Sequence, residues 1–330
     1  MPSRRAALAL LLPAAASARQ ASAQPANAQP AWPDRPLRLI IPTLGGAGTA
    51  DTLARILAQE MEKRFGQRVV VENRAGANGN IGATAAARST PDGTTFLWGW
   101  AGTLATNPAL YRDLPFDPVK DFEPVVLVGN VPNILVVNKG LGPTSLEAFT
   151  ALARAEPGRL HFGSTGNGSS MHLAGELFRQ STDTDLVHVP YSGPAPAVTD
   201  LLSGQIQLMF NLVTGAMPQI RGGEVLPIAV LSERRVPQLP DVPTTAELGL
   251  PGLVFGTWFG VLAPRGVAPA VIGRVNAVVN EILADPAAGQ RLQDGGMELY
   301  GGPPKRLASH LADELRRHAE IVRRSGARLD

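Results

Sequence analysis

The sequence predicts an α/β protein built from two lobes, and three observations support this fold class. From residue 37 onwards, short apolar runs typical of strands alternate with segments whose apolar residues recur at helical spacing. The run 68–72 is continuously apolar at Val69-Val70-Val71, as expected for a parallel strand buried on both faces. A length of 330 residues exceeds one ordinary hydrophobic core, so we expect two lobes, each a mainly parallel sheet flanked by helices.

The alternation of strands and helices is clearest between residues 37 and 98. A helix follows the first strand, with Asp51 as its expected N-cap and Leu53, Ile56, Leu57 and Met61 on its buried face. A turn rich in glycine and asparagine leads into a short alanine-rich helix over 81–88. The strands are expected at 37–42, 68–72 and 95–98.

The middle of the chain predicts a second set of strands and helices. An apolar stretch over 125–138 is interrupted at Val131-Pro132, where we expect the chain to pass into the second lobe. Further strands are expected at 160–162, 186–191, 205–210 and 226–231, the last of them returning to the first lobe. Helices are expected from Thr144 or Ser145 to Glu156, from Met171 onwards, up to Leu202, and over 217–223.

The last third completes the first lobe. A proline-rich loop over 236–245 precedes a strand at 258–263 and three amphipathic helices at 269–283, 287–294 and 303–324. We therefore expect lobe 1 to comprise 32–130 and 229–330, lobe 2 to comprise 131–228, and the chain to cross the hinge twice. Loops 43–51, 99–107, 163–170 and 191–194 follow strands, at the edge where open α/β sheets bind ligands.

The N-terminus predicts export. Arg4 and Arg5 precede an apolar run over 6–16, and Ala21-Ser22-Ala23 matches the small-residue cleavage pattern of a secretory signal peptide. We expect residues 1–23 to be removed by cleavage near Ala23, residues 24–31 to be a disordered leader, and the mature protein to be periplasmic. The pattern leaves open whether export uses the Sec or the twin-arginine route.

Composition excludes several classes of function. The chain has no cysteine, which excludes disulfides and thiolate metal sites, and its five histidines show no metal-binding spacing. Removing Arg4, Arg5 and Arg19 with the signal peptide leaves 27 basic and 28 acidic residues, so nothing indicates a nucleic-acid partner. We expect no cofactor and no catalytic metal.

The most informative stretch is a glycine-rich turn between a strand and a helix. After the apolar residues 160–162, the turn contains Gly163, Gly166 and Gly168 together with several hydroxyls, and Ser169 or Ser170 is the expected helix N-cap. Unpaired N–H groups and the positive end of the helix dipole make such a turn an anion site without Lys or Arg. The alternative is a tight connecting turn, but the hydroxyls and His172 favour a site.

Two enzyme hypotheses are weaker. Gly46-Ala47-Gly48-Thr49-Ala50-Asp51 nearly matches the G-x-G-x-x-G dinucleotide motif, with Glu72 as the ribose-binding acid, and would indicate an exported oxidoreductase. Asp51 replaces the third glycine, however, and its charge would face the pyrophosphate. A hydrolase would need a nucleophile elbow, but Gly163-Ser164-Thr165-Gly166 is not G-x-S-x-G and no His/Asp partner is evident. We therefore expect no enzyme.

The ordered motifs resemble one family over essentially all of the mature sequence. They include Leu114-Pro115-Phe116-Asp117-Pro118, Gly163-Ser164-Thr165-Gly166-Asn167-Gly168-Ser169 and His188-Val189-Pro190-Tyr191, together with segments 32–40, 71–82, 91–94, 172–178 and 239–244. The chain resembles the substrate-binding proteins of the tripartite tricarboxylate transporter family, also called Bug receptors.

This resemblance implies a type II periplasmic binding protein, with two lobes joined by a hinge that close on a ligand. It implies a small carboxylate ligand, such as a di- or tricarboxylate, an amino acid or an aromatic acid. It also implies a monomer whose partners are membrane transporter subunits or a sensor. Loop 163–169 looks like the family's carboxylate-binding loop, and loop 43–51 with Thr103 looks like the contact from lobe 1.

Two positions depart from the family pattern. The first loop, Pro42-Thr43-Leu44-Gly45-Gly46-Ala47-Gly48-Thr49-Ala50-Asp51, lacks the usual aromatic residue and has different spacing, and Asn211 stands where an aspartate is common. Both departures affect where the far end of the ligand would lie. The ligand-binding residues we expect are Gly45, Gly46, Asp51 and Thr103 in lobe 1, and Ser164, Thr165, Gly166, Asn167, Gly168, Ser169, His172, Tyr191 and Asn211 in lobe 2.

Overall fold

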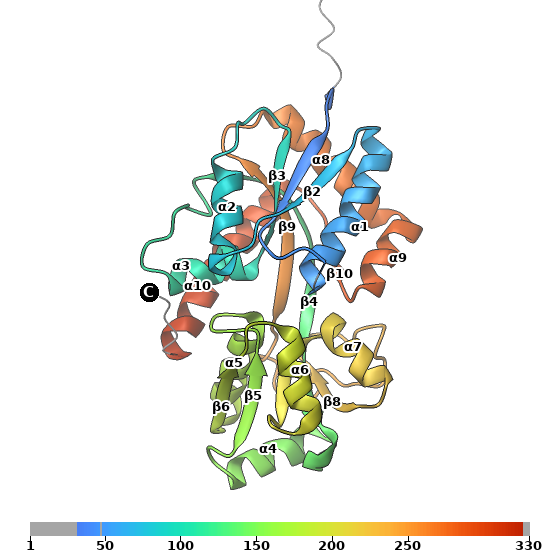
Figure 1. Cartoon of the computed structure of the whole chain (residues 1–330). Coiled ribbons are helices and arrows are strands. Elements are labelled where there is room, and N and C mark those ends of the chain that lie inside the picture. The colour runs from blue at the N-terminus through green and yellow to red at the C-terminus, as the bar shows by residue number, and fades with distance from the viewer. Residues whose placement is uncertain (1–31, 47, 326–330) are drawn as a thin grey trace, which may run out of the picture.

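The computed structural model describes residues 32–46 and 48–325, and the chain forms an upper and a lower lobe in Figure 1. The described strands form one mixed sheet in the order β2-β1-β3-β9-β4-β7-β5-β6, with β8 and β10 also paired to β4. This α/β architecture with two lobes confirms the predicted fold class. The predicted signal peptide and leader, 1–31, lie outside the described residues.

The upper lobe contains three parallel strands extended by antiparallel ones. β1 (Leu37–Ile41) lies between β2 (Val69–Asn73) and β3 (Thr95–Trp100), parallel to both, and β9 (Gly256–Pro264) pairs antiparallel with β3. The helices α1 (Gly48–Phe65) and α2 (Asn80–Ala87) follow the first two strands. Leu53, Leu57 and Met61 of α1 are fully buried, as the helical spacing predicts.

The lower lobe repeats this arrangement. β5 (Leu160–Ser164) lies between β6 (Leu186–Pro190) and β7 (Leu208–Leu212), parallel to both. The helices of this lobe are α4 (Leu146–Ala155), α5 (Ser170–Thr182), α6 (Pro194–Ser203) and α7 (Val213–Arg221). The side chains of Ser145 and Ser169 cap α4 and α5, and each is one of the two adjacent candidates predicted from the sequence.

One long strand, β4 (Phe122–Asn138), runs through both lobes (Figure 1). It pairs with β9 from Phe122 to Pro132 and with β7 from Asn133 onwards. The predicted interruption at Val131-Pro132 is therefore wrong, because Val131 and Pro132 remain in the β4–β9 ladder. Proline lacks only the N–H, so it can stay in a strand wherever no ladder bond needs that donor.

The return to the upper lobe also differs from the prediction. β8 (Val225–Val230) does not return but pairs antiparallel with the lower part of β4, between Ile134 and Asn138. The backbone N–H of Asn133 donates to the carbonyl of Phe255 at 2.9 Å, and the chain then enters β9. Leu253 and Phe255 are buried with residues of the lower lobe, so the chain leaves that lobe just before β9.

The C-terminal elements match the three predicted helices. These are α8 (Pro269–Ala284), α9 (Pro286–Asp294) and α10 (Pro304–Ser325), with the short strand β10 (Glu298–Leu299) before the last. Helix α10 begins in the upper lobe, where Leu307 is buried, and its last turns bury Ile321 and Val322 against the lower lobe. It therefore packs against both lobes, as Figure 1 shows for the red helix at the left.

Three smaller predictions are wrong in their boundaries. Residues expected as loop 99–107 form a π-helical turn η2 (Gly102–Thr106) and a short helix α3 (Asn107–Leu110). The strand expected over 205–210 and ending on Asn211 is β7, which begins only at Leu208 and continues to Leu212. Helix α7 starts at Val213, four residues earlier than predicted. The remaining short helices are η1 (Ala77–Gly79) and η3 (Lys139–Leu141).

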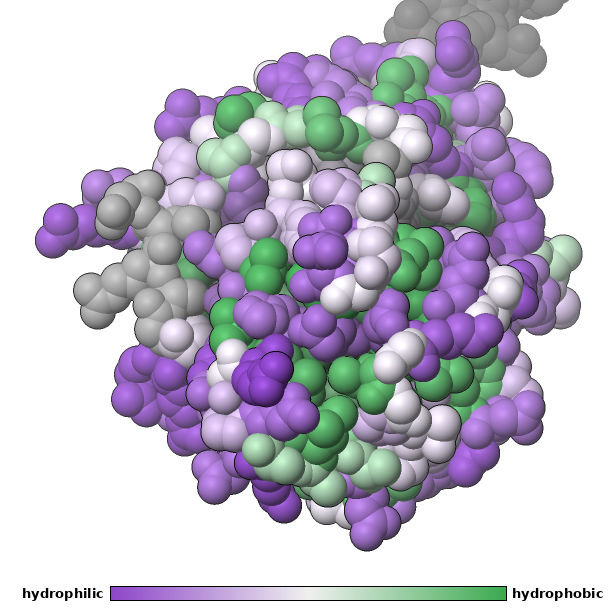
Figure 2. Space-filling model, turned by 60° about the horizontal axis from the view of Figure 1, so that its bottom comes forward, coloured by the Kyte–Doolittle hydropathy of each residue, from purple (hydrophilic) through white to green (hydrophobic). Residues whose placement is uncertain are grey.

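The surface of the described residues shows scattered apolar side chains. Figure 2, with the lower end of the molecule turned forward, shows them in patches separated by polar groups. None of the helices in 32–46 and 48–325 has the length and apolarity needed to cross a bilayer. Within the same residues, no group of His, Cys, Asp or Glu side chains is arranged to hold a metal ion.

Candidate functional site

Three segments of the upper lobe meet at the carboxyl ends of β1 and β3. A Cβ atom on Gly79 would lie 2.3 Å from Thr103 Oγ1 and 3.2 Å from Pro42 Cβ, and Gly79 has a φ of 91° that favours glycine. The loop after β1, the turn before α2 and the η2 turn therefore share one edge of the sheet. This is the edge where ligand loops were predicted.

An asparagine cluster holds these segments together. Asn78 Nδ2 donates to Asn107 Oδ1 at 2.6 Å, while Asn107 Nδ2 donates to the Asn78 carbonyl at 2.9 Å and to Asn80 Oδ1 at 2.6 Å. Thr103 is fully buried and its hydroxyl donates to the Asn78 carbonyl at 3.2 Å. The sequence interpretation missed the asparagines of this cluster, although their density in 73–80 was visible as turn chemistry.

Asp51 is an internal support of the first loop. It lies in the first turn of α1, three residues after the helix begins, so its predicted role as N-cap is wrong. Its buried carboxylate accepts bonds from Gly46 N at 3.0 Å, Arg55 Nε at 2.8 Å and Asn73 Nδ2 at 2.7 Å. Burial alone would raise the pKa of Asp51, but the bonds from Arg55, Asn73 and Gly46 hold it below its usual value. This fixed anion at the start of α1 also argues against a pyrophosphate there.

Gly45 and Gly46 of the first loop have different surroundings. Gly46 has a φ of 74°, and a Cβ atom there would meet no atom within 4 Å. A Cβ on Gly45 would lie 3.0 Å from Asn73 Oδ1, so Gly45 packs against the asparagine that also binds Asp51. Leu44, beside them, is 71% exposed, the largest exposed fraction among the bulky apolar residues described as exposed.

The glycine-rich turn of the lower lobe has the predicted form. β5 ends at Ser164, Gly166 and Gly168 have φ values of 114° and 76°, and Ser169 Oγ accepts from His172 N at 3.3 Å as the N-cap of α5. A Cβ on Gly168 would lie 2.1 Å from Leu110 Cδ1 in α3. The turn therefore rests directly against the upper lobe.

The backbone N–H groups of this turn divide into two sets. Gly166 N donates to Ser164 Oγ at 3.1 Å, Gly168 N to His172 Nδ1 at 3.1 Å, and Ser169 N to the Gly166 carbonyl at 3.2 Å. Among the described residues, the other N–H groups of the turn and of the first α5 residues have no acceptor, namely those of Thr165, Asn167, Ser170 and Met171. These four are the donors left for an anion.

Two stacked imidazoles lie next to this turn. The rings of His172 and His188 are 4.1 Å apart at 26°, and His188 Nε2 lies 2.6 Å from Ser164 Oγ. Burial, then the neighbouring His188 and Arg179, lowers the pKa of His172 to about 3. Burial, then Arg179, lowers the pKa of His188 to about 4. Both rings are therefore neutral at pH 7 and contribute no positive charge to the site.

The pairing of Ser164 with His188 was not anticipated, since the sequence showed no histidine partner for this serine. The pair does not form a nucleophile site. Ser164 is fully buried, and its oxygen already accepts a bond from Gly166 N. Among the residues the structure describes, no carboxylate bonds to His188, so the orienting acid of a hydrolase is missing.

Tyr191, directly after β6, and Asn211, on β7, lie at the ends of the two strands that neighbour β5. Tyr191 N donates to the Ser164 carbonyl at 2.9 Å, and its hydroxyl donates to Asp200 Oδ2 at 2.7 Å. Burial, then Asp200, raises the pKa of Tyr191 to about 12. The Oδ1 atom of Asn211 is buried without a donor among the described residues, and it faces Gly215 of α7.

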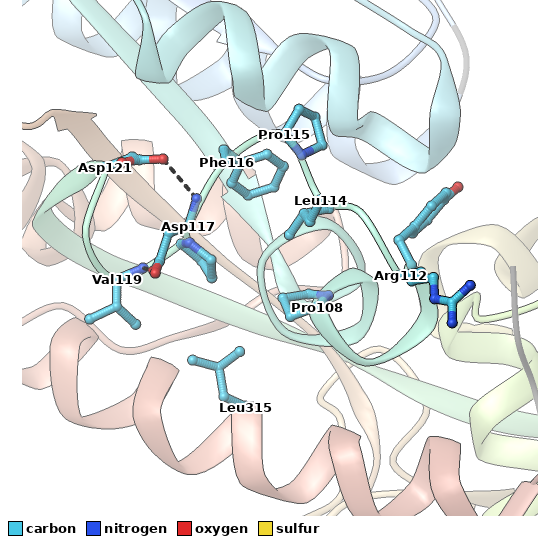
Figure 3. Close-up of a pocket in the computed structure, with 11 residues that line it drawn as sticks. Pro108, Arg112, Leu114, Pro115, Phe116, Asp117, Val119, Asp121 and Leu315 are labelled. Carbon is cyan, nitrogen blue, oxygen red and sulfur yellow. Dashed lines mark hydrogen bonds between the residues drawn. The ribbon is translucent and has the colours of Figure 1, made fainter. Parts of the chain in front are cut away.

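Two surface cavities lie elsewhere. One of about 610 Å³ is formed by segment 108–121 and Leu315 of α10, shown in Figure 3. The other, of about 570 Å³, lies between α4, the end of α5 and residues 248–250. Neither is lined by a predicted ligand-binding residue.

Comparison with known proteins supports one family. Residues 53–327 match the family model described as the tripartite tricarboxylate transporter family receptor. Among curated proteins, Protein BugT of Bordetella pertussis is 38% identical over 299 residues, covering 90% of this chain and 91% of BugT. The UPF0065 protein of the tcbD-tcbE intergenic region of Pseudomonas sp. strain P51 is 39% identical, covering 88% of this chain and 87% of that protein.

Solved structures agree with this match. Rpa4515 of R. palustris with adipate has a TM-score of 0.83 and 37% identity, covering 90% of this chain and 100% of that one. The periplasmic binding protein BugD has a TM-score of 0.79 and 34% identity, covering 90% and 99%. MatC of Rhodopseudomonas palustris with bound malate has a TM-score of 0.77 and 34% identity, covering 88% and 100%.

Proposed function

Since the chain belongs to the tripartite tricarboxylate transporter receptor family, we propose that it captures a small carboxylate between its lobes for a membrane transporter. The family and its solved neighbours are periplasmic substrate-binding receptors of the type II fold, not enzymes. Two of the neighbours carry adipate and malate. A small carboxylate is therefore the ligand class that fits this chain.

One observation carries the proposal: the free N–H groups of Thr165, Asn167, Ser170 and Met171 at the start of α5. A carboxylate accepts several such bonds, and each bond to a charged group contributes about 1.5–3 kcal/mol. Two or three of them suffice for micromolar capture after the entropy losses of binding. The donors are neutral, and the helix dipole adds attraction for an anion.

The contacts refine the roles of the predicted residues. Asp51, Thr103, Ser164 and Tyr191 bond to neighbouring groups of the protein, so we assign them to holding the loops in place. We assign ligand contact to the free backbone N–H groups of Thr165, Asn167, Ser170 and Met171 and to the side chain of Ser169, with His172 behind them. The far end of the ligand would be covered by Gly45, Gly46 and the exposed Leu44. Asn211 Oδ1, which has no donor among the described residues, would accept a hydrogen bond from the ligand.

The hinge in this proposal consists of two strand crossings. β4 passes between the lobes at Pro132-Asn133, and the chain returns at Phe255-Gly256. The packing of residues 229–255 with the lower lobe favours a lobe boundary near 255 over the boundary at 228 expected from the sequence. Closure would then bend two neighbouring strands.

Export completes the proposal. The resemblance of residues 1–23 to a signal peptide and the periplasmic family support delivery to the periplasm. A receptor there would bind its acid and pass it to transporter subunits. A sensor is the alternative destination. Uptake of the labelled acid by cells, lost on deletion of this protein and restored by it, would favour transport.

The first test is a thermal-shift screen of residues 24–330 against adipate, malate, other di- and tricarboxylates, acidic amino acids, aromatic acids and nicotinamide dinucleotides. Ligand at about 100 times its dissociation constant adds about 2.7 kcal/mol of stability. A shift with one class of acid supports the proposal. A thermal shift with dinucleotide alone overturns the proposal. Calorimetry that detects no binding of any acid at millimolar concentration also overturns it.

A further inference from the structure

The two stacked histidines are the feature that the proposed function leaves unexplained. His172 is buried in the first turn of α5 and His188 lies on β6, so they belong to different elements that meet under the turn. Phe162 also packs against His188, with ring centroids 5.0 Å apart. The rings thus form a layer directly beneath residues 164–168.

Each imidazole bonds to the turn through one nitrogen. His172 Nδ1 accepts the N–H of Gly168 at 3.1 Å, so that nitrogen carries no proton and the neutral ring is protonated at Nε2. His172 Nε2 lies 3.9 Å from Glu176 Oε1, too far for a hydrogen bond. His188 Nε2 lies 2.6 Å from the hydroxyl of Ser164, which in turn accepts the N–H of Gly166 at 3.1 Å.

These bonds select which amides of the turn remain free. Gly168 donates its N–H to His172, and Gly166 donates its N–H to the Ser164 oxygen that contacts His188. The residues between and before them, Asn167 and Thr165, keep theirs. The alternation depends on the left-handed φ values of Gly166 and Gly168, which reverse the direction of successive amides. A turn with a different internal bonding would offer a different set of donors.

We propose that His172 and His188 are positioning residues of the ligand loop: His172 acts through Gly168 N–H, and His188 acts through Ser164 and Gly166 N–H. Together they leave the amides of Thr165 and Asn167 for the carboxylate. The inference rests on the proposed function for the role of those amides. It goes beyond that function because neither histidine needs to touch the ligand.

The alternative is that the two rings only fill the core. Paired substitutions separate the two cases. His172→Phe and His188→Phe keep a ring in the stack but remove the nitrogen that bonds to the turn. His172→Asn restores an acceptor for Gly168 N–H, and His188→Gln restores a partner for the Ser164 hydroxyl. His161→Phe on β5 is the matched control, since His161 bonds to Gln207 and not to the turn.

The first readout needs no ligand. Amide hydrogen exchange of the mature chain is followed by NMR at Gly166 and Gly168. We expect exchange at Gly168 to be at least about tenfold faster in His172→Phe, because its amide loses its acceptor. We expect exchange at Gly166 to be faster in His188→Phe, because the Ser164 oxygen that accepts from it loses its contact with His188. Unchanged exchange in both variants would overturn the bonding role.

The second readout is affinity for the acid identified by the thermal-shift screen, measured by calorimetry. We expect about tenfold weaker binding in both Phe variants, partial recovery in His172→Asn and His188→Gln, and wild-type affinity in His161→Phe. Equal affinity in all variants would show that the rings only pack. If a Phe variant does not fold, Ser164→Ala removes the same link to His188 without changing either ring, and should weaken binding similarly.

The two proposals fail differently. If the wild-type protein binds no acid, the proposed function is lost while the exchange data still decide whether the histidines hold the turn. If the wild type binds an acid and the exchange or affinity results go against the histidines, only the further inference is lost.

Discussion

Thr214 Oγ1 in the first turn of α7 donates a hydrogen bond of 2.8 Å to the carbonyl of Gly295, just after α9. The bond links the lower lobe to the upper lobe on the flank opposite α10. A Cβ atom on the next residue, Gly296, would lie 2.8 Å from the same Thr214 oxygen, so the close approach requires glycine there. Gln238 adds a second bond across this boundary, to the Gln293 carbonyl.

We expect Thr214→Val to favour the open form, because the shape is kept while the bond between the lobes is lost. One such bond contributes about 1 kcal/mol, which corresponds to about fivefold weaker ligand binding. Small-angle scattering should show a larger radius of gyration in the absence of ligand. Thr199→Val, whose hydroxyl bonds only within α6, is the control. Identical scattering and affinity for both variants would contradict the role of Thr214 in closure.

Gly168→Ala tests the contact between the ligand turn and α3. A side chain at a φ of 76° costs about 1–2 kcal/mol, and the new methyl would meet Leu110 at 2.1 Å unless that side chain moves. We expect lower stability in urea and weaker carboxylate binding. Gly193→Ala is the matched control, since its φ is extended and a Cβ there meets nothing within 4 Å. Equal losses in both variants would show that the turn geometry is not limiting.

Asp51→Asn tests the support of the first loop. The amide keeps the volume, but it loses the charge that binds Arg55, which is itself 46% exposed and so partly solvated. We expect a loss of about 1–2 kcal/mol in urea denaturation at pH 7. The pKa of Asp51 is lowered on folding, so this stabilisation is present above its unfolded pKa and is lost as the pH falls. A difference between variant and wild type that persists unchanged at pH 2.5 would contradict this account.

The two buried histidines predict a stability change in mild acid. Their folded pKa values are about 3 and 4, whereas the unfolded chain binds these protons near pH 6.5. The unfolded state therefore carries more protons between about pH 6.5 and 4, and stability falls as the pH falls through this range. The slope is about 1.4 kcal/mol per pH unit for each histidine. As the pH falls, the melting temperature of His188→Phe should decrease less steeply than that of the wild type. Parallel curves for the two proteins would contradict the role of His188 in this pH dependence.

Local signals predicted the parts of the fold that local physics decides. The glycine turn before α5 and the three C-terminal helices were placed from spacing and capping residues, and the N-caps Ser145 and Ser169 were each one of two adjacent candidates. Each depends on neighbours within a few positions along the chain. Such features are readable without knowing which strands pair.

Long-range pairing accounts for two of the errors. The Val131-Pro132 pair resembles a break until β9 is known to lie beside it, and β8 resembles a returning strand until its pairing with the lower part of β4 is known. No residue within ten positions of either segment carries that information. Strand pairing decides the structure of both segments. For Val131-Pro132 the partner strand, β9, lies more than a hundred residues away in the sequence.

The form of the candidate turn could be predicted from the sequence, but its internal contacts could not. The sequence identified the turn 163–169, yet it did not pair Ser164 with His188. The strands β5 and β6 are parallel, and Phe162 lies opposite His188. Ser164, two residues after Phe162, therefore lies at the end of β5 within reach of the His188 side chain. Reading both strands as parallel neighbours, with a histidine two residues before the end of β6, was the signal that could have revealed it.

The single strand β4 has a consequence for how the molecule comes apart. Its upper residues, such as Val126 and Val128, belong to the core of one lobe, and its lower residues, such as Leu135 and Val137, belong to the core of the other. Melting either core removes the strand that the other core needs. We therefore expect the lobes to unfold as one cooperative unit, and fragments made by cutting the chain between them should not fold by themselves.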